Sequence, residues 1–182
     1  MADETKHAAI IGVVTASDRA SAGIYEDKSG PAIAAYLTKI LTSPFHIVRK
    51  IVPDGFESVR DTLIDLADRE HCDLILTTGG TGPSPRDLTP EATEAAAPRI
   101  LPGFGELMRE ESLKQIPTAI LSRQIAAHRG PCLVINLPGK PASIEICLNA
   151  VFPAVPYCLD LIGAAYIETD ATILKSFRPK QS

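Results

Sequence analysis

Four short segments rich in β-branched residues recur along the chain, and stretches with apolar residues at helical spacing separate them. The segments span residues 8–16, 45–52, 74–78 and 132–137. Three of them are nearly continuous apolar runs, as expected for strands covered on both faces. Helical spacing is found over residues 31–41, 57–69, 90–97, 104–116, 143–151 and 155–162. Alternating strands and helices predict an α/β fold, with a mostly parallel sheet between two helical layers.

Residues 124–129 are ambiguous, because they suit either a helix end or a strand before a turn at Gly130. The sheet therefore has room for one antiparallel strand. A chain of 182 residues suits a single domain. We place that domain at residues 8–179 and expect mobile ends at 1–7 and 180–182.

The charge and composition exclude several classes of protein. A net charge of -4 argues against a general nucleic-acid binder, which needs a basic surface. The N-terminal residues 1–7 are polar and lack the apolar region of a signal peptide, and the apolar runs are too short to span a bilayer, so we expect a cytoplasmic protein without a membrane partner. The four cysteines show no metal-ligand spacing and are interpreted as small buried hydrophobic residues.

Polar and glycine-rich residues directly follow each predicted parallel strand. In such sheets ligands bind beyond the carboxyl ends of the strands, so these residues are expected to share one rim. The rim segments are residues 17–19, 53–54, 79–82 and 138–139.

The strongest local signal is the segment Thr77-Thr-Gly-Gly-Thr-Gly82. Three glycines after a strand let the backbone approach a ligand and direct N–H groups at an anion. The segment matches neither a Walker loop nor a dinucleotide-binding fingerprint. A tight turn between strand and helix remains the alternative to a phosphate site.

Two aspartates on the rim are candidate functional carboxylates. Asp54 would otherwise belong to an ordinary Asp-Gly turn. Asp87 would otherwise cap the next helix, although Thr89 can serve as that cap before Pro90. Carboxylates beside phosphates usually hold Mg²⁺, which points to nucleotide chemistry.

If this acidic chain binds anions, it must do so with a local group of cations. The candidates are Arg19, Arg86, Arg123 and Lys140, with a solvated loop or an internal ion pair as the alternative for Arg19 and surface charge for Arg123 and Lys140. Glu106 is expected in the first turn of a helix, where the helix dipole favours a carboxylate.

Six motifs in this order resemble the molybdopterin-binding domains of the molybdenum-cofactor pathway, and most closely their adenylyl-transferring (MogA) type. The motifs are residues 17–19, 77–82, 86–90, 102–106, 121–124 and 136–139, and the resemblance covers about residues 8–179. It implies that the terminal phosphate of molybdopterin attacks the α-phosphate of ATP, releasing pyrophosphate. It also implies a homotrimer and transfer of the product to a molybdenum-inserting enzyme.

The resemblance further implies roles for particular residues. Asp54 and Asp87 would be the catalytic carboxylates, and we expect both to act through Mg²⁺, because a phosphomonoester is already mostly ionised at neutral pH. Residues expected to bind molybdopterin or ATP are Ser17, Asp18, Arg19, Thr78, Gly79, Gly80, Thr81, Gly82, Glu106, Ser122, Arg123, Asn136, Pro138, Gly139 and Lys140. The alternatives are a molybdopterin carrier, such as a non-catalytic MoaB-type paralogue, and a nucleotide-binding domain of another pathway.

Overall fold

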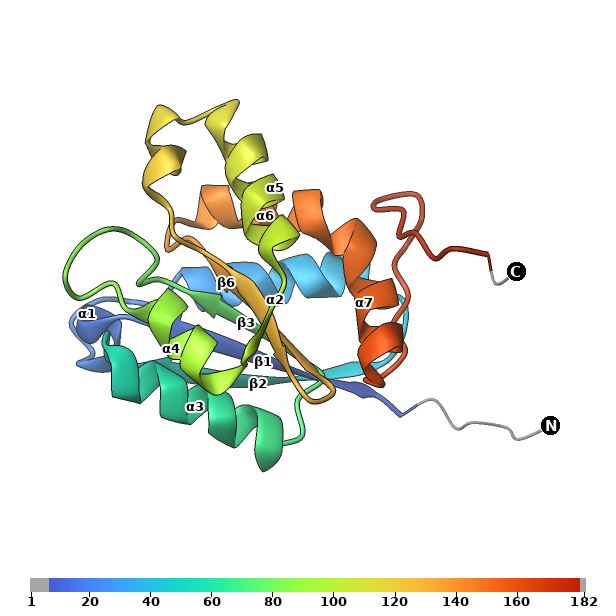
Figure 1. Ribbon diagram of the computed structural model, residues 1–182, viewed down its shortest axis with the longest axis horizontal. Helices are drawn as coiled ribbons and strands as arrows, with labels where there is room; N and C mark the ends of the chain where they lie inside the picture. The colour runs from blue at the N-terminus through green and yellow to red at the C-terminus, as the bar shows by residue number, and fades with distance from the viewer. Residues whose placement is uncertain (1–6, 181–182) are drawn as a thin grey trace.

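A six-stranded sheet forms the centre of the molecule in a computed structural model that describes residues 7–180 (Figure 1). The strand order is β2-β1-β3-β6-β5-β4. The expected mobile ends fall almost wholly on residues 1–6 and 181–182, which lie outside the described residues. The strands are β1 (Ala9–Ala16), β2 (Phe45–Val52), β3 (Leu74–Thr78), β4 (Arg99–Ile100), β5 (Ala126–Arg129) and β6 (Cys132–Leu137).

The predicted mostly parallel sheet is confirmed. Strand β1 pairs in parallel with β2 and β3, and β3 pairs in parallel with β6. Strand β5 runs antiparallel to both of its neighbours, β4 and β6, so the ambiguous segment before Gly130 is a strand. All residues of β3 and β6 are buried, which explains why their sequences show no alternation.

Helices cover both faces of the sheet, as predicted (Figure 1). On one face, α2 (Ser29–Ile40), α5 (Pro102–Leu113), α6 (Pro141–Val151) and α7 (Val155–Ile162) bury side chains such as Leu37, Met108 and Leu148. On the other face, α3 (Phe56–Asp68) and α4 (Thr89–Ala96) bury Leu63 and Ala92. The sheet is thereby removed from water on both sides.

The structure differs from the sequence-based expectation at several boundaries. The expected loop after β1 contains a short helix, α1 (Asp18–Ser21), because the Ser17 side chain accepts a hydrogen bond from the Ala20 N–H and starts a helical turn. Helix α5 begins at Pro102 and ends at Leu113, and a 3₁₀ helix, η1 (Pro117–Leu121), follows it.

One segment contradicts the expectation that every apolar run is too short to cross a membrane. Residues Pro141–Ile162 are long and apolar enough for this by length and composition. They form α6, a 3₁₀ turn η2 (Phe152–Ala154) and α7, and half of the apolar window is buried inside the fold. Because Leu148, Phe152 and Leu159 pack into the core, we interpret the segment as core helices.

The cysteines are packed as the sequence predicts. Cys72, Cys132 and Cys147 are buried, Cys158 is half-buried, and none forms a disulfide. Burial raises the pKa of the Cys72 thiol to about 12, so this thiol stays protonated and unreactive near neutral pH.

The chain changes direction at the centre of the sheet. From β1 the chain passes through α2 to β2 on one side, and then through α3 to β3 on the other side of β1. Helices α2 and α3 cover opposite faces. The carboxyl ends of β1 and β3 therefore form a crevice where the strand order reverses, which is where open α/β sheets bind ligands.

Candidate active site

The loop after β3 has a backbone that only glycine can adopt. Gly79 has a φ of 95°, and a Cβ on it would lie 2.3 Å from the carbonyl oxygen of Ala16. Gly80 has a φ of 65°, and a Cβ there would lie 2.3 Å from Thr89 Oγ1. The Thr89 hydroxyl donates to the Gly79 carbonyl at 2.9 Å, which ties the loop to the start of α4. The glycines are therefore required for the close packing of this loop.

This loop also presents free N–H groups. The Gly79 N–H donates to the Leu137 carbonyl at 3.3 Å. Among the described residues, no acceptor is recorded for the N–H groups of Gly80, Thr81 and Gly82. Successive unpaired backbone donors at a strand end suit the oxygens of a phosphate.

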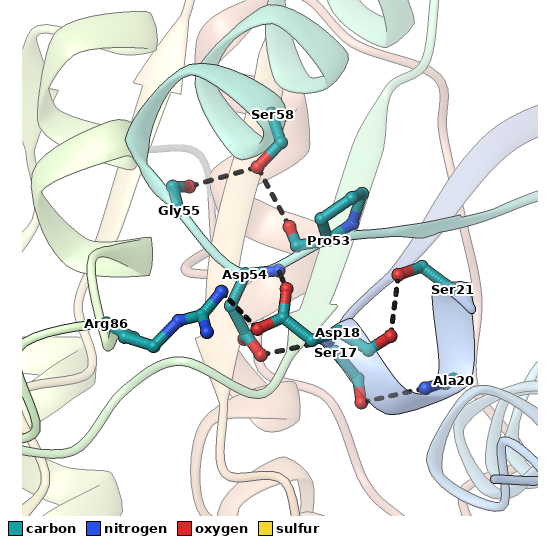
Figure 2. A network of polar contacts seen from close by, with 9 residues as sticks. All are labelled: Ser17, Asp18, Ala20, Ser21, Pro53, Asp54, Gly55, Ser58 and Arg86. Atoms are coloured by element: carbon teal, nitrogen blue, oxygen red, sulfur yellow. Dashed lines mark hydrogen bonds and ion pairs between the residues drawn. The ribbon is translucent and has the colours of Figure 1, made fainter. Parts of the chain in front are cut away.

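Asp54 and Asp18 form a reciprocal pair at the neighbouring strand ends. The Asp18 N–H donates to Asp54 Oδ2 at 3.0 Å, and the Asp54 N–H donates to Asp18 Oδ1 at 3.1 Å. Arg86 forms an ion pair with the second oxygen of Asp18 (Figure 2). The pair fixes the Asp54 carboxylate beside the glycine loop, with Oδ1 3.7 Å from the position that a Gly80 Cβ would occupy.

Asp87 lies against the far end of the same loop. Its Oδ2 accepts the Ser84 N–H at 3.0 Å and would lie 2.8 Å from a Cβ on Gly82. The structure thus brings both predicted carboxylates to the glycine loop, Asp54 at Gly80 and Asp87 at Gly82.

Arg123 holds the loop from behind. Its backbone N–H donates to the Thr81 carbonyl at 2.8 Å, and its Nε donates to the Gly82 carbonyl at 2.9 Å. The remaining guanidinium bonds go to the Asp87 carbonyl and to the Glu91 carboxylate of α4. This arginine therefore uses most of its donors to shape the loop.

The Arg123–Glu91 contact predicts a pH-dependent contribution to stability. The hydrogen bond from Arg123 holds the pKa of the Glu91 carboxyl below its ordinary value of 4.5. The stabilisation is therefore fully present above that value and is lost as the pH falls through the lower pKa of the folded state. Urea unfolding of wild type and Glu91→Gln should show a difference at neutral pH that disappears in acid. Glu94→Gln, at an exposed position of α4, is the control, and a difference independent of pH would contradict the prediction.

Two pockets flank the glycine loop. The smaller has a volume of about 140 Å³ and lies over the crevice between β1 and β3. Of the predicted residues it is lined by Ser17, Thr78, Gly79 and Gly139. The larger, of about 260 Å³, is lined on its predicted side by Thr81, Gly82, Ser122, Pro138 and Lys140. The loop separates two spaces that can each hold part of a ligand.

Six predicted binding residues lie outside the lining of these pockets. Asp18, Gly80 and Arg123 belong to the contacts around the glycine loop described above, and the other three lie elsewhere. Asn136 is fully buried below the loop, where it donates to the hydroxyls of Thr77 and Thr93. The Arg19 guanidinium stacks 5.5 Å from the Tyr25 ring centroid. Glu106 is exposed in the second turn of α5, not in its first turn as expected, because that helix begins two residues earlier.

The suggested capping of α4 by Thr89 is also wrong. Leu88 occupies the cap position without a side-chain bond, and Thr89 is the first helical residue. The Thr89 hydroxyl donates to the Gly79 carbonyl instead, so it stabilises the glycine loop and does not cap the helix.

Sequence reasoning missed four residues that shape the pockets. Asp27, in the smaller pocket, accepts the N–H groups of Ser29 and Gly30 at 3.0 Å and the guanidinium of Arg49. Arg109, Ser112 and Gln124 line the larger pocket. Arg109 and Ser112 lie in a stretch of α5 that has the pattern of an ordinary amphipathic helix, so only their partners in space reveal them.

The residues present fit a magnesium ion held together with phosphates. Among residues 7–180, no group of three or more His, Cys, Asp or Glu is arranged to hold a metal ion. Mg²⁺ bound to a nucleotide needs only one or two carboxylates, since phosphates and water complete its shell. Asp54 Oδ1 and Asp87 Oδ1 receive no recorded hydrogen bond from the described residues, so each carboxylate has an oxygen to offer.

The comparisons with known proteins all point to proteins that bind or synthesise molybdopterin derivatives. Residues 12–157 match the family described as "Probable molybdopterin binding domain". A curated molybdopterin adenylyltransferase of Helicobacter pylori is 56% identical over 94% of this chain and 97% of its own. The molybdopterin adenylyltransferase of Escherichia coli K12 is 46% identical, covering 94% of each chain. The crystal structure of the molybdopterin biosynthesis enzyme MoaB from Thermus thermophilus is similar with a TM-score of 0.78, at 42% identity over 86% of this chain and 98% of that one.

Proposed function

Because this chain belongs to the molybdopterin-binding domain family, we propose that it is an enzyme that transfers AMP from ATP to molybdopterin. The terminal phosphate oxygen of molybdopterin forms a bond to the α-phosphorus of ATP. The bond from that phosphorus to the β-phosphate oxygen breaks, and pyrophosphate leaves. The products are adenylyl-molybdopterin and pyrophosphate, within molybdenum-cofactor biosynthesis.

The observation that carries this proposal is the glycine loop between two pockets, with one carboxylate at each end. The N–H groups of residues 80–82 are available to phosphate oxygens, and one substrate can approach from each side of the loop. A phosphomonoester loses its second proton near pH ~6, so the nucleophile needs no general base at neutral pH. We therefore assign the rate enhancement to positioning and charge neutralisation.

The two aspartates would hold magnesium in this scheme. A magnesium ion, when bound, would neutralise charge on the phosphates at the loop. Asp18 and Arg86 keep Asp54 in place, and the Ser84 N–H does so for Asp87.

The catalytic function is favoured over that of a carrier. The curated relatives that cover nearly the whole chain, at 46% to 56% identity, are named as adenylyltransferases. The homotrimer, the cytoplasmic location and the transfer of product to a molybdenum-inserting enzyme rest on the family resemblance and stay predictions.

We expect the purified protein to transfer label from ATP labelled at the α-phosphate to molybdopterin in the presence of Mg²⁺, releasing one pyrophosphate for each AMP transferred. Label in the γ-phosphate should appear only in pyrophosphate, and omission of molybdopterin is the control. Molybdopterin binding without AMP transfer would favour the carrier, and ATP binding without molybdopterin binding would favour an unrelated nucleotide-binding domain.

A further inference from the structure

The lining of the larger pocket combines cationic, neutral polar and apolar side chains. The pocket lies between α5, η1, the glycine loop and the start of α6, and its volume is about 260 Å³. Its charged lining residues are Arg109 and Lys140, and none of its described lining residues is acidic. Apolar side chains supply part of the walls, namely Ile116, Ala119, Leu121 and Pro138, and neutral polar side chains supply most of the rest, namely Thr81, Ser112, Thr118, Ser122, Gln124 and Ser143. This combination suits a flat heterocycle with polar edges.

Arg109 is held in place at this pocket by its Nη1 atom, and its other N–H groups remain available to a ligand. Its Nη1 donates to the Gln124 carbonyl at 2.8 Å and makes a longer contact of 3.5 Å to the Ser122 carbonyl. Gly105, one turn earlier in α5, makes room for the guanidinium, since a Cβ there would lie 3.2 Å from both terminal nitrogens. The N–H groups on Nε and Nη2 have no recorded acceptor among the described residues. Arg109 therefore offers donors in a fixed orientation.

Gln124 supplies the complementary acceptor. This residue is 1% exposed, and its Oε1 is one of two buried side-chain polar atoms without a hydrogen-bond partner among the described residues. Its Nε2 makes only a weak contact of 3.6 Å to Cys147 Sγ. A buried amide without proper partners is costly and calls for an explanation. Gln124 lines the larger pocket, and its last torsion is soft, so rotation of the amide can bring the oxygen to a ligand there.

We propose that Arg109 and Gln124 together recognise the lactam edge of the pterin ring, and so direct molybdopterin to the larger pocket. A pterin carries a C4 carbonyl next to an N3–H, and this edge needs one donor and one acceptor side by side. Arg109 donates to the carbonyl, and Gln124 Oε1 accepts from the N–H. This inference rests on the proposed function, which makes molybdopterin a substrate.

The same pair disfavours adenine. Adenine presents an amino group next to an unprotonated ring nitrogen, which is the reverse order of donor and acceptor. Arg109 would then face a donor, and the Gln124 oxygen would face an acceptor. Unmatched polar groups in a buried site strongly reduce affinity, so the pair separates the two heterocycles of the reaction.

The test uses two ligands that differ only at the edge in question. Pterin has the C4 carbonyl, and 2,4-diaminopteridine carries an amino group there. We expect wild type to bind pterin at least about tenfold more tightly than 2,4-diaminopteridine, as followed by pteridine fluorescence. Arg109→Gln and Gln124→Leu should each weaken pterin binding by about tenfold or more and remove this preference, while binding of 2,4-diaminopteridine changes little.

Kinetics of AMP transfer provide the second readout. Both variants should raise the KM for molybdopterin and leave the KM for ATP unchanged, and Arg109→Lys should recover part of the loss because it keeps one donor. Arg99→Gln, at an exposed position of β4, is the control. Thermal unfolding of each variant shows that the fold is retained.

Three outcomes separate this inference from the proposed function. Equal weakening of both pteridines, or an equal rise in the KM for ATP, would overturn the recognition role. AMP transfer by a wild type that shows no preference between the ligands would do the same and leave the proposed function standing. A wild type with the expected preference but without AMP transfer would support the recognition role and refute the proposed function.

Discussion

Asp54→Asn is expected to lower the rate of AMP transfer by about a hundredfold or more, because it removes an anionic ligand from the magnesium ion that would neutralise the phosphates. The amide oxygen of Asn can still accept the Asp18 N–H that Asp54 Oδ2 accepts at 3.0 Å, so the loop should keep its shape. The measurement is kcat at saturating ATP and molybdopterin. Asp61→Asn, at an exposed carboxylate of α3, is the matched control and should behave as wild type.

Asp87→Asn extends the same prediction to the metal. If both carboxylates act through magnesium, this variant should need a higher Mg²⁺ concentration for half of its maximal rate. A general-base role would instead move the pH profile and leave the Mg²⁺ requirement unchanged. That second result would refute our assignment of Asp87.

Gly79→Ala is expected to destabilise the fold by about 3 kcal/mol or more. Alanine at this position would have to adopt a φ near 95°, and its Cβ would lie 2.3 Å from the Ala16 carbonyl oxygen. Since Ala16 belongs to β1, relief of this contact would move the crevice at the centre of the sheet. Urea unfolding measures the effect.

Gly103→Ala is the matched control for this glycine. It lies in the first turn of α5, and a Cβ there meets nothing within 4 Å. We expect a change between zero and about 1 kcal/mol in the stabilising direction, because Ala favours a helix over Gly. Equal effects at the two positions would show that the close approach at Gly79 is unimportant.

Local patterns in the sequence were sufficient to predict the architecture. The buried strands at 74–78 and 132–137 and the amphipathic α3 follow from apolar periodicity within each segment. The rim followed from a topological rule, and the structure does bring Asp54 and Asp87 to the glycine loop. These features depend on neighbours in sequence or on the general geometry of parallel sheets.

Features that depend on single long-range contacts were not predictable. Asn136 was expected to contact the ligand, but its amide donates to the hydroxyls of Thr77 in β3 and Thr93 in α4. Arg123 was expected to face the substrates, but it holds the backbone of residues 81–87. Arg109 was overlooked because its partner, the Gln124 carbonyl, lies in a different segment. Charge and residue type do not reveal which of these partners a side chain will meet.

The position of β3 between β1 and β6 has a consequence for synthesis of the chain on the ribosome. Strand β3 is complete at Thr78, but its second neighbour is made only with Leu137. In the interval, a wholly buried strand of the finished fold has an unpaired edge, which is the kind of surface that associates with other chains. The glycine loop begins at the end of that same strand. A nascent chain that stops before β6 would therefore be prone to aggregation and would lack a formed site, because β3 cannot pair with β6 until residue 137 has been made.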